Sequence, residues 1–127
     1  MKRAACLLVT LVFGLAAAGS VLAFDRQNIE HNVNGIVESL DKGTNPESIN
    51  PNDVSPYAFI MEQDGTLLVH PDLAGESLKA AAEPVYKALI DATPEGTWVD
   101  YVWKEKQKHS YVRTTQSGLI VGSGYTE

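Results

Sequence analysis

Cysteine is almost absent from the 127-residue chain, whose single one, Cys6, lies in an apolar segment at the N-terminus. A disulfide needs two cysteines, and the remaining residues offer no thiol nucleophile and no cysteine ligand for a metal. The three histidines, His31, His70 and His109, lack a paired metal-ligand spacing such as His-x-x-x-His. We therefore expect a domain that depends on its hydrophobic core and has no metal site.

The sequence also lacks the common motifs of enzymes. Gly122-Ser123-Gly124 falls within a predicted terminal strand, whereas a nucleophilic serine would stand at a strand-to-helix elbow. No glycine-rich loop opens a helix to hold a phosphate, and the acidic residues are scattered over loops. We therefore predict that the protein is not an enzyme, has no catalytic residues and needs no cofactor.

Basic residues are few, with 10 Lys and Arg against 16 Asp and Glu and a net charge of −6. Two of the ten, Lys2 and Arg3, stand at the extreme N-terminus, so the chain without them carries −8. Such a charge repels nucleic acid and anionic lipid headgroups. Neither is therefore an expected partner.

The first 23 residues have the layout of a secretory signal peptide. Lys2 and Arg3 are followed by an almost wholly apolar run, and Val21-Leu22-Ala23 suits a signal peptidase. Cleavage after residue 23 would place the protein in the periplasm or the outside medium, without stable membrane insertion. An uncleaved anchor is the alternative, although residues 4–22 are only marginally long enough to span a bilayer.

Residues 28–40 have the apolar spacing of one helix face. Hydrophobic side chains recur at intervals of three or four positions, namely Ile29, Val33, Ile36, Val37 and Leu40. Gly43 follows as a stop signal. We expect an N-terminal helix within residues 24–43, whose stripe packs on its own sheet or on a second subunit.

Five short strands are predicted in the rest of the chain. The first two, at 57–61 and 66–70, are separated by the hairpin signal Asp64-Gly65. A second helix begins near Pro84. The last three strands follow at 97–103, 108–115 and 119–125. Since the connections between strands are short apart from the helical crossover, we predict an α+β fold with a central antiparallel five-stranded sheet, on which the long N-terminal helix and short helices pack.

Several motifs appear in a fixed order between Tyr57 and Tyr125. They occur in the segments YAFIMEQDGTLLVHPDLAGESL, GTWVDYVW, KHSYVR and GLIVGSGY. Together, Tyr-x-Phe, Asp-Gly, His-Pro, Tyr-x-Trp, Lys-x-x-Tyr and Gly-Ser-Gly-Tyr resemble a single Cache domain, the PAS-like sensor module of extracytoplasmic proteins.

This resemblance implies a PAS-like fold with helices on one side of the sheet and a pocket for a small ligand. Members of the family are usually the outer part of chemoreceptors, histidine kinases and cyclic-dinucleotide enzymes, and serve chemotaxis and other signal transduction. Their ligands are often small carboxylates or amino acids. Because no membrane segment or output domain follows Tyr125, we expect a soluble, exported, stand-alone binding domain at 24–127 with its PAS-like core at 57–125.

Strand alternation selects the candidate pocket residues. Tyr101 and Trp103 share one face of their strand, and His109, Tyr111 and Arg113 share one face of the next. We expect these five side chains to converge, because a few polar groups in an apolar cleft are typical of a small-molecule site. With two residues of the first hairpin, the predicted ligand-binding set is Tyr57, His70, Tyr101, Trp103, His109, Tyr111 and Arg113.

Each of these residues also has a structural interpretation. Aromatic residues are enriched in strands simply because they pack well there. The planar fork of Arg113 suits a carboxylate ligand, but it equally suits an ion pair with Asp100 or Glu62.

Lys108 and His70 raise separate questions. Lys108 matches the Lys-x-x-Tyr motif, but alternation turns it away from Tyr111, so it lies either at a bulge or on the surface. His70 ends a strand that Pro71 stops. It is a structural corner, as the resemblance implies, or a pocket contact that would make binding sensitive to pH between about 5 and 8.

The sequence therefore predicts an exported Cache-domain protein that senses or carries a small anionic or zwitterionic metabolite, such as a carboxylate or an amino acid. It would act as a monomer or homodimer, and a membrane receptor or kinase is the candidate signalling partner. The alternative is an extracytoplasmic protein-interaction or dimerisation module without a physiological small ligand, in which side chains fill the pocket.

Overall fold

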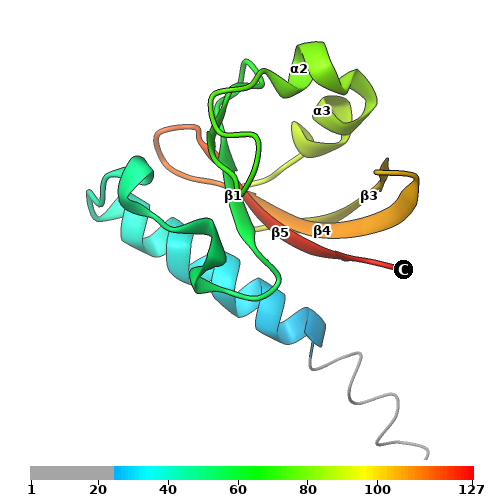
Figure 1. Cartoon of the computed structure of the whole chain (residues 1–127). Helices are drawn as coiled ribbons and strands as arrows, with labels where there is room; N and C mark the ends of the chain where they lie inside the picture. Colours follow the sequence, from blue (N-terminus) through cyan, green and yellow to red (C-terminus); the bar gives the residue numbers. More distant parts are fainter. Residues whose placement is uncertain (1–24) are drawn as a thin grey trace, which may run out of the picture.

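One antiparallel sheet of five strands, in the order β2-β1-β5-β4-β3, organises the structure (Figure 1). The computed structural model describes residues 25–127, so the predicted signal peptide at 1–23 lies outside the described residues. A helix over residues 25–41 comes first. The strands are β1 (Ala58–Met61), β2 (Leu67–Val69), β3 (Thr97–Trp103), β4 (Lys106–Thr114) and β5 (Ile120–Thr126).

Short helical segments fill the two longer connections. Two 3-10 turns, η1 (Pro46–Ser48) and η2 (Pro51–Asp53), link the N-terminal helix to β1. Two helices, α2 (Leu78–Ala81) and α3 (Glu83–Leu89), link β2 to β3. Pro84 lies in the first turn of α3, as predicted. The expected α+β fold with a central five-stranded antiparallel sheet is confirmed.

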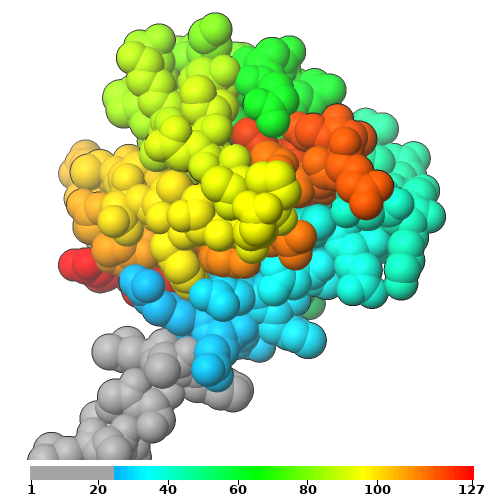
Figure 2. Space-filling view, turned by 180° about the vertical axis from the view of Figure 1, so that it is seen from behind, coloured from blue at the N-terminus to red at the C-terminus, as the bar shows by residue number. Residues whose placement is uncertain are grey.

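Helices cover both faces of the sheet, which corrects the expectation of helices on one side. The N-terminal helix crosses one face, and α2 and α3 lie on the other (Figure 1). Seen from behind, the yellow and orange residues of β3 and β4 form a band between these two layers (Figure 2). Because side chains alternate along a strand, each strand contributes to two separate cores.

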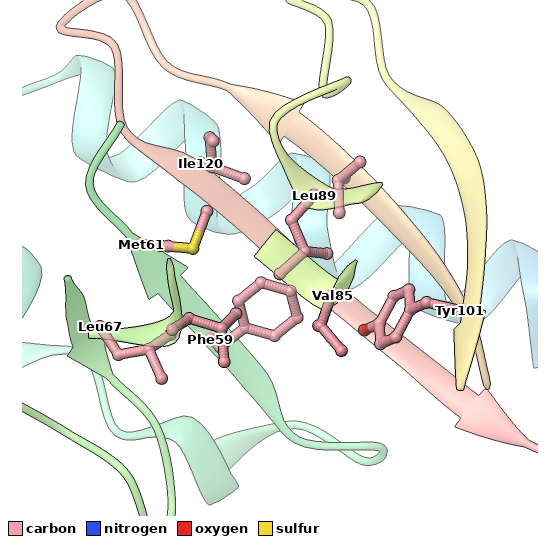
Figure 3. Packing of buried hydrophobic residues seen from close by; sticks show 9 residues of the cluster. Phe59, Met61, Leu67, Val85, Leu89, Tyr101 and Ile120 are labelled. Atoms are coloured by element: carbon pink, nitrogen blue, oxygen red, sulfur yellow. The ribbon is translucent and has the colours of Figure 1, made fainter. Parts of the chain in front are cut away.

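The core beneath α2 and α3 combines aromatic and aliphatic side chains. Figure 3 shows Phe59 and Val85 between Leu67 on one side and Tyr101 on the other. The second core joins the N-terminal helix to the sheet through Ile29, Val33, Val37, Ile60, Val69, Tyr111 and Val121. The apolar stripe of this helix therefore packs on the domain's own sheet.

Polar contacts fix the start of the N-terminal helix against β3 and β5. The Arg26 guanidinium lies 4.4 Å from the ring centre of Trp98 and donates a 3.0 Å hydrogen bond to the Tyr125 hydroxyl. The indole of Trp98 donates to the Glu30 carboxylate at 2.7 Å.

Among residues 25–127, no helix is both long and apolar enough to cross a bilayer.

Candidate ligand pocket

A small cavity lies between the sheet and the layer formed by α2 and α3. It encloses about 270 Å³, including a part open to solvent, but only about 20 Å³ is wide enough for the centre of a water molecule. This space suits about one or two waters. Its lining is mostly apolar and aromatic, with Tyr57, Phe59, Leu67, His70, Leu78, Val85, Leu89, Tyr101, Trp103 and Lys108.

Lys108 is the charged side chain of this lining, and it is only 4% exposed. Its Nζ donates a 3.0 Å hydrogen bond to the Tyr57 hydroxyl. The same atom lies 4.6 Å from the ring centre of Tyr57 and 5.9 Å from that of Trp103. No carboxylate among residues 25–127 lies within 4.0 Å of Lys108, so aromatic faces and one phenol surround this ammonium.

Burial acts directly on the protonation of Lys108. Removal from water disfavours the charged form, and the nearby Lys104 adds repulsion, so the pKa of Lys108 falls to about 8. Lys108 is held here by the register of the β3–β4 hairpin, where it stands directly opposite Tyr101. Two residues along the same face, Ser110 exchanges a 2.8 Å hydrogen bond with the Tyr101 hydroxyl.

His70 forms the corner of the pocket after β2. Its Nδ1 accepts hydrogen bonds from the backbone N–H groups of Asp72 and Leu73, both at 3.0 Å. A nitrogen that accepts cannot carry a proton, so the proton of the neutral ring is on Nε2. The imidazole also packs edge-on against Tyr57 and Trp103, with ring centres 5.1 and 6.2 Å away.

His70 closes a backbone turn and also lines the cavity, while its contact with a ligand stays a prediction. The expected pH sensitivity between about 5 and 8 is wrong for this side chain. Burial, followed by the charge of Lys108, lowers the pKa of His70 to about 4. The ring is therefore neutral throughout that range.

The seven predicted site residues divide between the two faces of the sheet. Tyr57, His70, Tyr101 and Trp103 line the cavity. The expected convergence of the other three with them is wrong, because Tyr111 stands opposite Trp98 on the face beneath the N-terminal helix. Because side chains alternate along β4, His109 and Arg113 lie on the same face as Tyr111.

These three residues have structural partners on the helix side. Arg113 donates to the Asn34 side chain at 2.9 Å and to the Pro94 carbonyl at 2.7 Å, and among residues 25–127 it forms no ion pair with Asp100 or Glu62, the structural alternative. The Tyr111 hydroxyl donates to the carbonyl of Glu95 at 3.1 Å.

His109 lies between two carboxylates at the end of the sheet. Its Nδ1 and Nε2 lie 2.5 Å from the carboxylates of Asp100 and Glu127. Hydrogen bonds to these two acceptors raise the pKa of His109, since they favour its charged form. This cluster therefore stabilises the hairpin and the end of β5.

Lys108 is the functional candidate that the sequence interpretation missed. The alternation of side chains correctly placed Lys108 on the face of Ser110, opposite to that of Tyr111. The conclusion that Lys108 lies at a bulge or on the surface was wrong, because it is buried at a regular position of the β3–β4 pairing. The Lys-x-x-Tyr motif was the available signal. This lysine is the main electrostatic feature of the cavity, because the other lining residues are apolar, aromatic or histidine. Among residues 25–127, no group of three His, Cys, Asp or Glu side chains is suited to a metal.

Comparison with known proteins gives a likeness to solved structures alone. Neither a scan against protein-family models nor a search of curated proteins finds a match. Among solved structures, the chain is similar to the ligand binding domain of Mlp24 with asparagine, at a TM-score of 0.40 and 19% identity. The match covers 63% of this chain and 31% of that chain.

Proposed function

We propose that the protein is an exported Cache-type module that binds a small carboxylate or amino-acid-like metabolite in this pocket. The observation that carries the proposal is the buried Lys108 ammonium, which has no carboxylate partner among residues 25–127. A buried charge is costly unless a partner compensates it. A ligand carboxylate would supply that partner, and the Tyr57 hydroxyl and the His70 imidazole add hydrogen-bonding groups beside it.

The aromatic lining favours a compact ligand with an apolar part. Tyr57, Trp103 and Tyr101 contribute aromatic rings to the lining, and Leu67 and Val85 contribute aliphatic side chains. Because the space is narrow, a ligand larger than a few atoms requires these side chains to move. Acetate, propionate, glycine and alanine are therefore the first compounds to test.

Thermal unfolding of the purified protein with these compounds tests the proposal. A ligand that binds only the folded state at 100 times its dissociation constant adds about 2.7 kcal/mol of stability. Lys108→Met should abolish this gain, because it removes the charge while keeping a flexible apolar stem. Lys106→Met is the matched control, since Lys106 is exposed on the same strand. Equal gains in both variants would contradict the role of Lys108.

The narrowness of the cavity favours a second candidate function, a protein-interaction module whose pocket is filled by its own side chains. In that case no small ligand raises the melting temperature, and Lys108→Met leaves association with a membrane receptor or kinase unchanged. Light scattering distinguishes a monomer from a homodimer.

The proposed export rests on residues 1–23, and the mass of the protein recovered outside the cytoplasm shows whether they have been removed.

A further inference from the structure

Lys108 has surroundings that suit a nucleophilic amine as well as an ion-pair partner. The side chain is 4% exposed, faces a cavity, and has its Nζ 3.0 Å from the Tyr57 hydroxyl. Lysines that attack carbonyl carbons in proteins are desolvated in an apolar pocket or lie next to another cation. Lys108 meets both conditions, since aromatic rings surround it and Lys104 adds positive charge nearby.

The protonation of Lys108 supports this interpretation. Its pKa of about 8 leaves a far larger share of neutral amine near pH 7 than the ordinary value of 10.5 does. The ratio of the neutral fractions is about 300, since each unit of pKa changes it tenfold. The groups that face Nζ are Tyr57, Trp103 and His70, and the charge of Asp72 acts on both Tyr57 and His70. Tyr57 and His70 are neutral near pH 7, so neither forms an ion pair that would hold the ammonium.

We propose that Lys108 captures small carbonyl compounds in this cavity as a reversible imine. The inference shares its pocket with the proposed function and names a covalent class of ligand for it. A carbonyl compound that also carries a carboxylate would place that group beside the imine nitrogen, which forms an ion pair with it when protonated.

The step balances without an oxidant or a reductant. The lone pair of neutral Nζ forms a bond to the carbonyl carbon, and the π pair of the C=O bond moves onto oxygen. One of the two Nζ protons is then transferred to that oxygen, which gives a carbinolamine. The Tyr57 hydroxyl, 3.0 Å from Nζ, is the nearest group that can pass this proton. The carbinolamine then loses its hydroxyl and the proton left on nitrogen as one molecule of water, which leaves the C=N double bond.

Reductive trapping tests the inference. The purified protein is treated with glyoxylate and cyanoborohydride near pH 7, and the modified lysines are located by peptide mass mapping. We expect Lys108 to gain a carboxymethyl group at least about 10-fold faster than the exposed Lys106. Tyr57→Phe should slow this labelling and leave Lys106 unaffected. Lys108→Arg should remove the fast phase, and in denaturant all lysines should react alike.

Labelling of Lys108 at or below the rate of Lys106 in the folded protein would overturn the inference. The result is independent of the proposed function, because that function is tested with carboxylates that have no aldehyde or ketone group to form an imine. If acetate or glycine stabilises the protein and Lys108 is not trapped faster than Lys106, carboxylate binding is supported and imine formation is rejected. Fast trapping without stabilisation by any carboxylate supports the imine and rejects carboxylate binding.

Discussion

At the scale of single residues, the buried charge of Lys108 makes stability depend on pH. Its pKa falls from 10.5 to about 8 on folding, so between these values the unfolded chain binds more protons than the folded one. The free energy of unfolding therefore rises with pH through this window. From about pH 8 to about pH 9.5 we expect a rise of about 1.5 kcal/mol, in a range that stays below the ordinary tyrosine pKa of about 10.

Guanidinium unfolding at both pH values measures this rise in the wild type and in Lys108→Met. The variant should lack it, because the titrating group is gone, whereas Lys106→Met should retain it. A pH dependence that is the same in all three proteins would contradict the burial of the Lys108 charge.

His70 contributes through the turn that it closes. His70→Ala leaves the N–H groups of Asp72 and Leu73 without an acceptor, so we expect a loss of about 1–2 kcal/mol in the free energy of unfolding. His70→Asn should recover much of it, because an asparagine side chain accepts from the same backbone positions. If His70→Asn loses as much free energy of unfolding as His70→Ala, the effect comes from packing of the imidazole ring against Tyr57 and Trp103 instead.

Acid titration gives His70 a second signature. Its pKa is about 4 when folded against an ordinary 6.5, so the unfolded chain takes up the proton first. The stability that His70 provides is complete above pH 6.5 and is lost as the pH falls toward 4. The melting temperature of the wild type should therefore fall relative to that of His70→Asn across this interval, because asparagine does not titrate there.

At the scale of strands and helices, the strands and the N-terminal helix were predicted from the sequence, but the wrong faces of β3 and β4 were paired with each other. Alternation within β3 and within β4 was correct, yet Tyr101 and Tyr111 were placed on one face. The turn between these strands has two residues, Lys104 and Glu105, both with positive φ. Any even-numbered turn puts odd positions of β3 opposite even positions of β4, so loop parity should have separated the two tyrosines.

The tight contact between β4 and β5 gives a prediction at this scale. A Cβ on Gly124 would lie 2.2 Å from the His109 carbonyl oxygen and 2.2 Å from the Ser110 hydroxyl. Because the strand backbone would have to move, Gly124→Ala should lower the free energy of unfolding by about 3 kcal/mol. Gly35→Ala is the control, since nothing lies within 4 Å of its Cβ and alanine favours a helix by up to about 1 kcal/mol.

Chemical denaturation of both glycine variants provides the comparison. Two variants of equal stability would show that β4 and β5 are less closely packed than the structure indicates. The sequence marks Gly122 and Gly124 as unusual within a strand, but only the pairing with β4 reveals which atoms exclude a side chain.

At the scale of the whole molecule, the sheet separates two layers that should act independently. Ile29→Ala removes a 1% exposed side chain from the core beneath the N-terminal helix, on the face opposite the cavity. We expect the free energy of unfolding to fall by about 2–5 kcal/mol. The dissociation constant for any pocket ligand should stay the same, because distant sites without shared partners are additive.

Calorimetric titration of the folded Ile29→Ala protein is the check on this independence. A parallel loss of ligand affinity would show that the helix and the pocket are coupled through the sheet. Helices on both faces could not be predicted from the apolar stripe alone, because the stripe is equally suited to a sheet and to a second subunit.

The two tryptophans of the chain both belong to β3, and they face opposite ways. Trp103 lines the cavity, whereas Trp98 lies under Arg26 on the helix side. Intrinsic fluorescence therefore contains one reporter for each layer. In Trp98→Phe the remaining emission should respond to a pocket ligand, and in Trp103→Phe it should respond to detachment of the helix, so one strand gives an optical record of both halves of the domain.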